Sequence, residues 1–174
     1  MGTGKSTVAR QLSQKFGLDC LDTDRMIESR SNKTVREIFA ESGEQSFRDL
    51  ESEVLAECLE RQIPCVIAGA GGIVVREANR DVINSCRSSG HVIVVWLHAL
   101  PNVLVARTSK GAHRPLLDDD REGTLVRLAN EREPLYASVS DIVVDVSERS
   151  VESTVNLLVE AITEDLKEKA LSDE

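Results

Sequence analysis

The chain has 174 residues, and its 30 Asp and Glu outnumber its 21 Lys and Arg to give a formal net charge of −9 at pH 7. This acidic balance argues against a nucleic-acid-binding protein, which needs a basic patch for the phosphates, and an aromatic content of 3% leaves few rings for base stacking. No segment has the roughly 20 consecutive apolar residues of a membrane span. We therefore expect one domain over residues 1–174 that binds neither nucleic acid nor membrane.

The cysteines form no C-x-x-C pair and only three histidines accompany them, so the sequence predicts no zinc site. We interpret the thiols as buried and reduced rather than paired in disulfides. The N-terminus lacks the charged region and apolar run of a signal peptide, which favours a cytoplasmic protein. The cysteines are Cys20, Cys58, Cys65 and Cys86.

The first half of the chain alternates helical and strand patterns. Apolar residues four apart predict the first helix, which Gly17 ends. Thr34 and Glu37 have the spacing of a capping box for a second helix, and Gly43 ends that helix. The predicted elements are helices over 5–16, 35–41 and 44–61, and strands over 18–21 and 65–68.

The second half continues the alternation. Its strands are continuous apolar runs, as expected of strands that are buried on both faces. Pro101 suits the first turn of a helix. We predict strands over 92–97 and 142–146, and helices over 101–108, from about 121 to 133 and over 151–169. Residues 109–120 are polar and irregular, and the charged tail 168–174 is expected to fray. The alternation predicts an α/β fold with a parallel sheet.

The chain opens with the second half of the G-x-x-x-x-G-K-[ST] phosphate loop, whose backbone amides bind phosphates at a helix N-terminus. Lys5 would bridge the outer phosphates, and the Ser6 hydroxyl would ligate Mg²⁺. The alternative is a glycine-rich turn that only caps a helix. The residues of the loop are Gly2, Thr3, Gly4, Lys5, Ser6 and Thr7.

Five further motifs follow this loop in a fixed order, and together the six resemble the shikimate kinase family from Gly2 to about Leu166. The motifs are Asp22-Thr23-Asp24, Phe47-Arg48, Gly71-Gly72, Arg114-Pro115-Leu116-Leu117 and Glu131-Arg132-Glu133-Pro134-Leu135-Tyr136. The resemblance implies a three-layer P-loop kinase fold with a parallel sheet flanked by helices. It also implies Mg²⁺- and ATP-dependent phosphorylation of the shikimate 3-hydroxyl, in aromatic amino-acid (chorismate) biosynthesis. We expect a monomer whose partners are shikimate and ATP.

The same resemblance implies that the central strand before the phosphate loop is absent from this chain. We expect the natural polypeptide to begin about ten residues earlier, with Met1 inside the loop, because a central strand of a parallel sheet is buried on both faces. For the same reason we expect the chain as written to be poorly soluble or weakly active.

The resemblance also assigns roles around the second strand. Asp22 would hold Mg²⁺ through water, opposite Ser6. Asp24 would bind the attacking hydroxyl and act as a catalytic residue, together with Lys5. Phosphoryl transfer needs such a positioned metal and an oriented acceptor oxygen. The alternative is that Asp24 only caps the helix that follows it.

In the substrate-binding region, residues 24–61, the resemblance implies an arginine clamp. Arg48 and Arg132 would bind the shikimate carboxylate, whose geometry matches the planar guanidinium fork. Gly71 and Gly72 would bring their backbone amides to the substrate. Ala70 stands where the family has a further glycine, and this leaves the shape of the turn open.

On the nucleotide side, the resemblance makes residues 109–120 a lid, and its Arg114 would be catalytic and ATP-binding. Arg107 and Arg149 would flank the adenine, although Val151 replaces a proline that the family often has there. Two alternatives to shikimate kinase activity remain at this point. The chain could be a related small-molecule kinase that resembles gluconate kinase, or a truncated remnant that is weakly active or silent.

Overall fold

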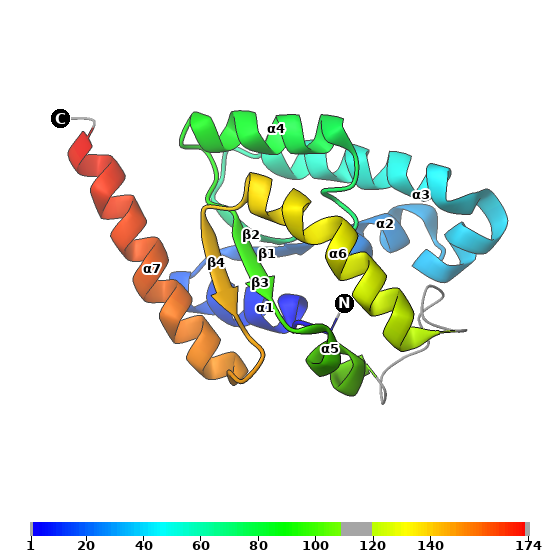
Figure 1. Ribbon diagram of the computed structural model, residues 1–174. Coiled ribbons are helices and arrows are strands. Elements are labelled where there is room, and N and C mark those ends of the chain that lie inside the picture. Colours follow the sequence, from blue (N-terminus) through cyan, green and yellow to red (C-terminus); the bar gives the residue numbers. More distant parts are fainter. Residues whose placement is uncertain (1, 109–119, 173–174) are drawn as a thin grey trace.

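The computed structural model describes residues 2–108 and 120–172 (Figure 1). Seven helices alternate with four short strands in these residues. The helices are α1 Lys5–Phe16, α2 Thr23–Ser31, α3 Val35–Leu59, α4 Glu77–Ser88, α5 Pro101–Thr108, α6 Arg121–Val139 and α7 Val151–Ser172. The strands are β1 Asp19–Asp22, β2 Cys65–Ala68, β3 Val95–His98 and β4 Ile142–Asp145.

The strands form two parallel pairs. β1 pairs with β2, with Asp22 opposite Ala68, and β3 pairs with β4, with His98 opposite Asp145. Within the described residues each pair is a two-stranded sheet of its own. Helices connect successive strands, as parallel pairing requires, so the predicted α/β fold is confirmed. The carboxyl ends of β1 and β2 lie together, and both are followed by motif residues.

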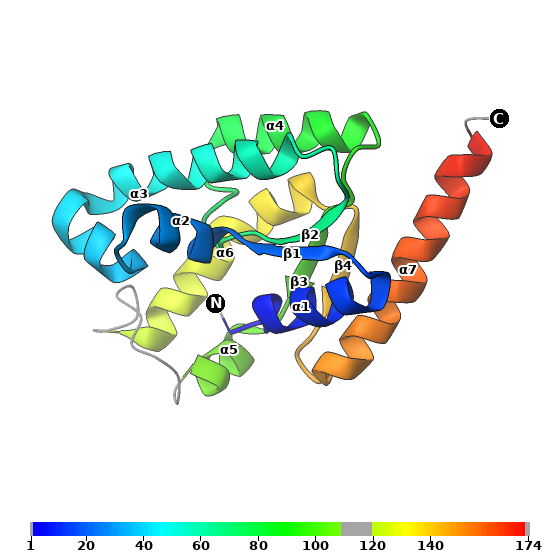
Figure 2. The same cartoon turned by 180° about the vertical axis from the view of Figure 1, so that it is seen from behind.

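Both strand pairs contribute to one apolar cluster, and β2 also contributes to a second one, because successive side chains of a strand point to opposite faces. On one face Val66 of β2 packs with Val95 and Leu97 of β3 against α1, α5 and α7. On the other face Ile67 of β2 packs against side chains of α3, α4 and α6. Figures 1 and 2 show the resulting three layers, with helices on both sides of the strands.

A hairpin of α2 and α3 projects beside the carboxyl end of β1. The predicted capping box is confirmed, since the Thr34 side chain accepts from the Glu37 amide and the Glu37 side chain accepts from the Thr34 amide. Gly43 has φ 78° and ψ 174°, a conformation that favours glycine, so the two predicted helices are one helix with a kink. Phe39 and Phe47 pack across this kink with ring centroids 4.7 Å apart.

Two elements in the middle of the chain differ from the prediction. Helix α4 was not predicted, because its buried residues are only Asn79 and Ile83 and the apolar pattern is sparse. Strand β3 begins at Val95 rather than at residue 92. Just before it, the Val94 amide donates to a carboxylate oxygen of Asp141, which takes the place of a neighbouring strand.

Two helices are longer than predicted. α6 continues past Glu133 and through Pro134, because the following Tyr136 and Val139 pack into the cluster under α3 and α4. α7 extends to Ser172, beyond the predicted end at residue 169. The frayed tail over 168–174 stays a prediction, and residues 173–174 lie outside the described part. No helix in the described ranges is long and apolar enough to cross a bilayer.

The cysteine prediction is confirmed in one respect and wrong in another. All four thiols are free, but only Cys58 is buried. Cys20 of β1 is exposed, while Cys65 and Cys86 are partly exposed.

Candidate active site

The phosphate loop leads directly into α1. Gly4 has φ 83° and caps α1 with its carbonyl, which accepts from the Thr7 amide at 3.0 Å and the Val8 amide at 2.9 Å. No side chain caps this end of α1 in the described residues. The first amides of the helix are therefore available to an anion, as in phosphate-binding loops. Gly2 lies against α5, since a Cβ there would approach the Thr108 Cγ2 atom to 3.0 Å.

The end of β1 contacts this loop through one hydrogen bond. Ser6 Oγ donates to Asp22 Oδ2 at 2.7 Å, and Lys5 Nζ donates to Ser6 Oγ at 3.4 Å. Asp22 Oδ1 accepts from the amides of Asp24 and Arg25, so Asp22 is the N-cap of α2. The alternative that Asp24 caps this helix is therefore wrong; Asp24 lies in the first turn.

The residues at this junction fit a magnesium ion. In the described part of the chain no three His, Cys, Asp or Glu side chains gather in a way that could hold a metal. Mg²⁺ does not require such a group, since it binds through one or two carboxylates together with substrate phosphates and water. The Ser6 hydroxyl and Asp22 carboxylate, 2.7 Å apart beside the phosphate loop, supply oxygen ligands of this kind.

Arg48 and Glu51 form a buried ion pair on α3. Their side chains are 7% and 0% exposed, and Arg48 Nη1 lies 2.8 Å from Glu51 Oε2. Arg48 Nη2 also pairs with Glu44 at 2.9 Å. Burial lowers the pKa of Arg48, but the nearby charges of Glu51 and Glu44 outweigh it and the net shift is upward. Arg48 is thus held as a cation in a fixed orientation.

Glu51 connects this pair electrostatically to two other predicted site residues. Burial raises the pKa of the Glu51 carboxyl; Arg48 and Arg132 lower it, and Asp24 raises it. Asp24, Arg48 and Arg132 therefore lie within electrostatic range of one buried carboxyl. Within the described residues, the Glu51 Oε1 atom is buried without a hydrogen-bond partner.

The turn after β2 joins α3 to α6 at this point. The Gly71 carbonyl accepts from Arg132 Nη1 at 2.9 Å and from the Tyr136 hydroxyl at 2.5 Å. Burial raises the pKa of the Tyr136 phenol, which keeps it a donor. The backbone of Gly72 lies under Arg48, because a Cβ there would be 1.9 Å from Arg48 Nη1. These contacts bring Arg48, Gly71, Gly72 and Arg132 together.

The substitution at Ala70 does not strain the turn. Among the described residues, Asn32 is the one non-glycine with positive φ, so Ala70 has an ordinary backbone conformation. Its amide donates to Thr23 Oγ1 at 2.8 Å, and Ala70 is 5% exposed. Thr23, between Asp22 and Asp24, therefore ties β1 to the turn.

Arg107 and Arg149, the two arginines predicted to flank the adenine, lie away from the cluster around Arg48 and Arg132. Arg107 Nη2 donates to the carbonyls of Val146 at 2.7 Å and Ser147 at 3.2 Å. Arg149 is exposed and lines a pocket of about 440 Å³ at the start of α7. The two thus border the loop after β4. The structure does not describe residues 109–119, which include Arg114 and all of the predicted lid except Asp120. The lid and the role of Arg114 therefore stay predictions.

The family model for shikimate kinase matches residues 1–163. The chain belongs to the shikimate kinase family. Shikimate kinases of Marinomonas sp. and Pseudoalteromonas atlantica are similar, at 38% identity over 169 residues and 39% over 165 residues. These alignments cover 96% and 94% of this chain, and 90% and 93% of the relatives.

Solved shikimate kinase structures have the same fold. The enzyme of Acinetobacter baumannii in complex with shikimate superposes with a TM-score of 0.87 at 31% identity, over 95% of this chain and 89% of that one. The enzyme of Bacteroides thetaiotaomicron gives 0.79 at 28% identity, over 94% of each chain. The expected three-layer kinase fold, with parallel strands flanked by helices, is confirmed.

Sequence reasoning missed one residue of this shikimate kinase site. Glu51 follows Arg48 by three residues, so the two share a face of α3. That face continues with the buried Val54, Leu55 and Cys58. A carboxylate on an otherwise apolar helix face needs a buried partner, and this signal is present in the sequence.

We expect Glu51→Ala to destabilise the fold by about 3 kcal/mol, because it leaves a buried guanidinium without its closest counter-charge. The remaining ion pair between Arg48 and Glu44 keeps the loss at the low end of the range for broken buried ion pairs. Urea unfolding measures the free energy of unfolding of each variant. Glu51→Gln is the matched control, since it keeps the volume and an oxygen acceptor for Arg48, and should lose less. Equal stability of Glu51→Ala and the parent would contradict a structural role for the pair.

Proposed function

We propose that this chain transfers the γ-phosphoryl group of ATP to the 3-hydroxyl of shikimate, which gives shikimate 3-phosphate and ADP. The observation that carries the proposal is the short segment of residues 22–24. Asp22 accepts from Ser6 of the phosphate loop at 2.7 Å, and Asp24 lies within electrostatic range of the buried pair on α3. Residues 22–24 therefore connect the phosphate loop, where the nucleotide would bind, to the cluster around Arg48, where shikimate would bind.

On the nucleotide side, the amides of residues 2–7 bind the phosphates and Lys5 neutralises their outer charge. Ser6 and Asp22 would hold Mg²⁺, which when bound neutralises charge on the phosphates. Arg107 and Arg149 flank the base, since both border the loop after β4.

On the acceptor side, Arg48 and Arg132 bind the shikimate carboxylate, and residues 24–61 supply most of this region. Arg48 is oriented by Glu44 and Glu51 before any substrate binds, so little side-chain entropy is lost on binding. Asp24 accepts a hydrogen bond from the attacking hydroxyl and takes its proton as the new O–P bond forms.

An assay of ADP release with shikimate or gluconate, each with and without Mg²⁺, tests this function. We expect turnover with shikimate and Mg²⁺, and little with gluconate or without the metal. Preference for gluconate would favour the related-kinase alternative, and no turnover with either would favour an inactive remnant.

Arg132→Lys should raise KM for shikimate by about tenfold or more and leave KM for ATP nearly unchanged. An ammonium group cannot reproduce the planar fork of the guanidinium, and the contact of Arg132 Nη1 with the Gly71 carbonyl fixes that fork in place. Steady-state kinetics with each substrate varied in turn gives both constants. Arg127→Lys is a matched control, since Arg127 is an exposed residue of the same helix that pairs with Glu131. An unchanged KM for shikimate would remove Arg132 from the clamp.

A further inference from the structure

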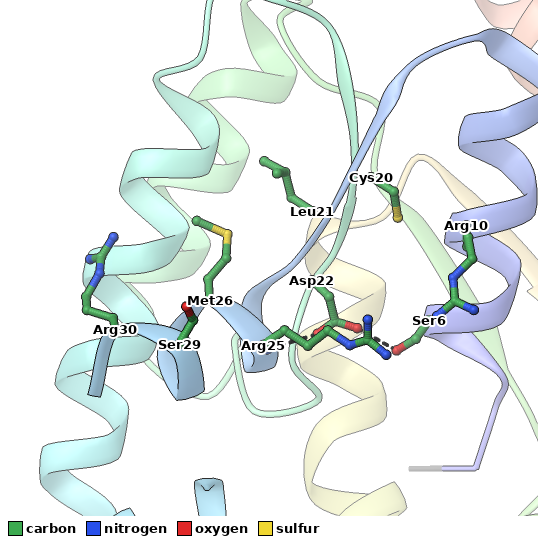
Figure 3. Close-up of a pocket in the computed structure, with 9 residues that line it drawn as sticks. All are labelled: Ser6, Arg10, Cys20, Leu21, Asp22, Arg25, Met26, Ser29 and Arg30. Atoms are coloured by element: carbon green, nitrogen blue, oxygen red, sulfur yellow. Dashed lines mark hydrogen bonds between the residues drawn. The ribbon is translucent and has the colours of Figure 1, made fainter. Parts of the chain in front are cut away.

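A second cavity lies on the outer side of β1, between α1 and α2, with a volume of about 560 Å³ (Figure 3). Volumes of this order accommodate small organic ligands. Ser6 and Asp22 stand at one edge of the cavity. The other lining residues lie outside the phosphate loop and are not Asp24, Arg48, Gly71, Gly72 or Arg132, the residues proposed to bind shikimate. None of their side chains has a role in the proposed reaction.

Two exposed arginines without a side-chain partner among the described residues point into this cavity. Figure 3 shows the side chains of Arg10, from α1, and Arg25, from α2, extending toward the same region beside Ser6. Neither makes a hydrogen bond or ion pair through its side chain in the described part of the chain. Most other arginines there are held by carboxylates or carbonyls, for example Arg30 by Glu57 and Arg87 by Asp141.

The charges of the cavity are not balanced internally. Asp22 is its only carboxylate among the described residues, and its oxygens already accept from Ser6 Oγ and from the amides of Asp24 and Arg25. Two guanidinium groups are thus left uncompensated in a chain whose formal net charge is −9. Guanidinium groups bind phosphates and carboxylates through paired N–H donors.

Besides these cations, the cavity lining contains apolar side chains next to Ser29 and to Arg30, which is paired with Glu57. Leu21 of β1 and Met26 of α2 supply these apolar side chains, and the thiol of Cys20 lines the cavity on the side of Arg10 (Figure 3). We propose that this cavity binds a small organic anion, with its phosphate or carboxylate between Arg10 and Arg25 and its apolar body against Leu21 and Met26.

Such a ligand would occupy a site separate from the nucleotide. The phosphate loop presents the backbone amides of residues 2–7 at the start of α1, whereas Arg10 lies one helical turn after Ser6. The anion and the nucleotide should therefore bind at the same time. The full chain can be tested for this by calorimetry in the presence of saturating ADP and shikimate, with phenyl phosphate and benzoate as the two anionic probes.

Inorganic phosphate tests the contribution of charge alone, and benzyl alcohol tests the apolar body alone. We expect phenyl phosphate or benzoate to bind more tightly than either of these. Arg10→Gln and Arg25→Gln should each weaken binding by about tenfold or more, since each removes a charge-assisted contact. Arg36→Gln is the matched control, because Arg36 is exposed on α3 and outside the cavity. The preferred probe distinguishes a phosphate ligand from a carboxylate ligand.

Cys20 provides a second measurement, since its exposed thiol lines the cavity. The bound anion should slow alkylation of Cys20 by iodoacetamide at least fivefold and leave the rate at Cys86 unchanged, as followed by mass spectrometry. Displacement of the probe by ADP, or equal binding by Arg10→Gln, Arg25→Gln and the parent, would overturn the proposal. Loss of binding in Lys5→Ala would do the same, because it would place the probe in the phosphate loop.

Discussion

Replacing Asp24 with asparagine should lower turnover by about 10²–10⁴-fold and leave the affinity for ATP close to that of the parent. The exchange keeps the size of the side chain and removes its charge at the acceptor hydroxyl. The cap of α2 stays intact because Asp22, not Asp24, accepts from the first amides. A loss of activity therefore cannot be attributed to a broken helix start.

Steady-state kinetics and ATP titration measure the two effects separately. Asp81→Asn is the matched control, since Asp81 is exposed on α4 and remote from the site motifs. Removal of the Asp24 charge should also lower the raised pKa of Glu51, because Asp24 is one of the groups that raise it. More than about a tenth of the parental turnover would rule out a proton-accepting role for Asp24.

The parts of the site that could be predicted from sequence depend on short, local spacing. Gly4, Lys5 and Ser6 must be adjacent to form a loop at a helix start, and Asp22 follows an apolar strand directly. Such patterns fix backbone geometry within a few residues. The same holds for the capping box at Thr34 and for the kink at Gly43.

What could not be predicted depends on contacts between distant segments. The bond from Arg132 to the Gly71 carbonyl spans 61 positions, and the bond from the Ala70 amide to Thr23 spans 47. Family resemblance placed Arg132 in the site, but no local pattern indicates which carbonyl orients it.

Replacing Gly72 with alanine should raise KM for shikimate by about 10–100-fold while KM for ATP changes little. A Cβ at Gly72 would lie 1.9 Å from Arg48 Nη1 and 2.5 Å from its Cζ, far inside contact distance. The side chain of Arg48 cannot yield without leaving Glu51, with which it is buried. The methyl group thus displaces the guanidinium, and the charge-assisted contact to the substrate carboxylate is lost.

Gly69→Ala is the matched control three positions earlier, since its Cβ would meet Ile73 at an ordinary 3.5 Å. Urea unfolding of both variants shows whether Gly72→Ala also weakens the buried ion pair, and kinetics are then compared at a temperature where each is folded. A double-mutant cycle with Arg48→Ala gives the decisive comparison. If the methyl group acts by displacing Arg48, it should change KM for shikimate little once Arg48 is gone. An equal rise in both backgrounds would mean that Gly72 acts through its own backbone amide and not through Arg48.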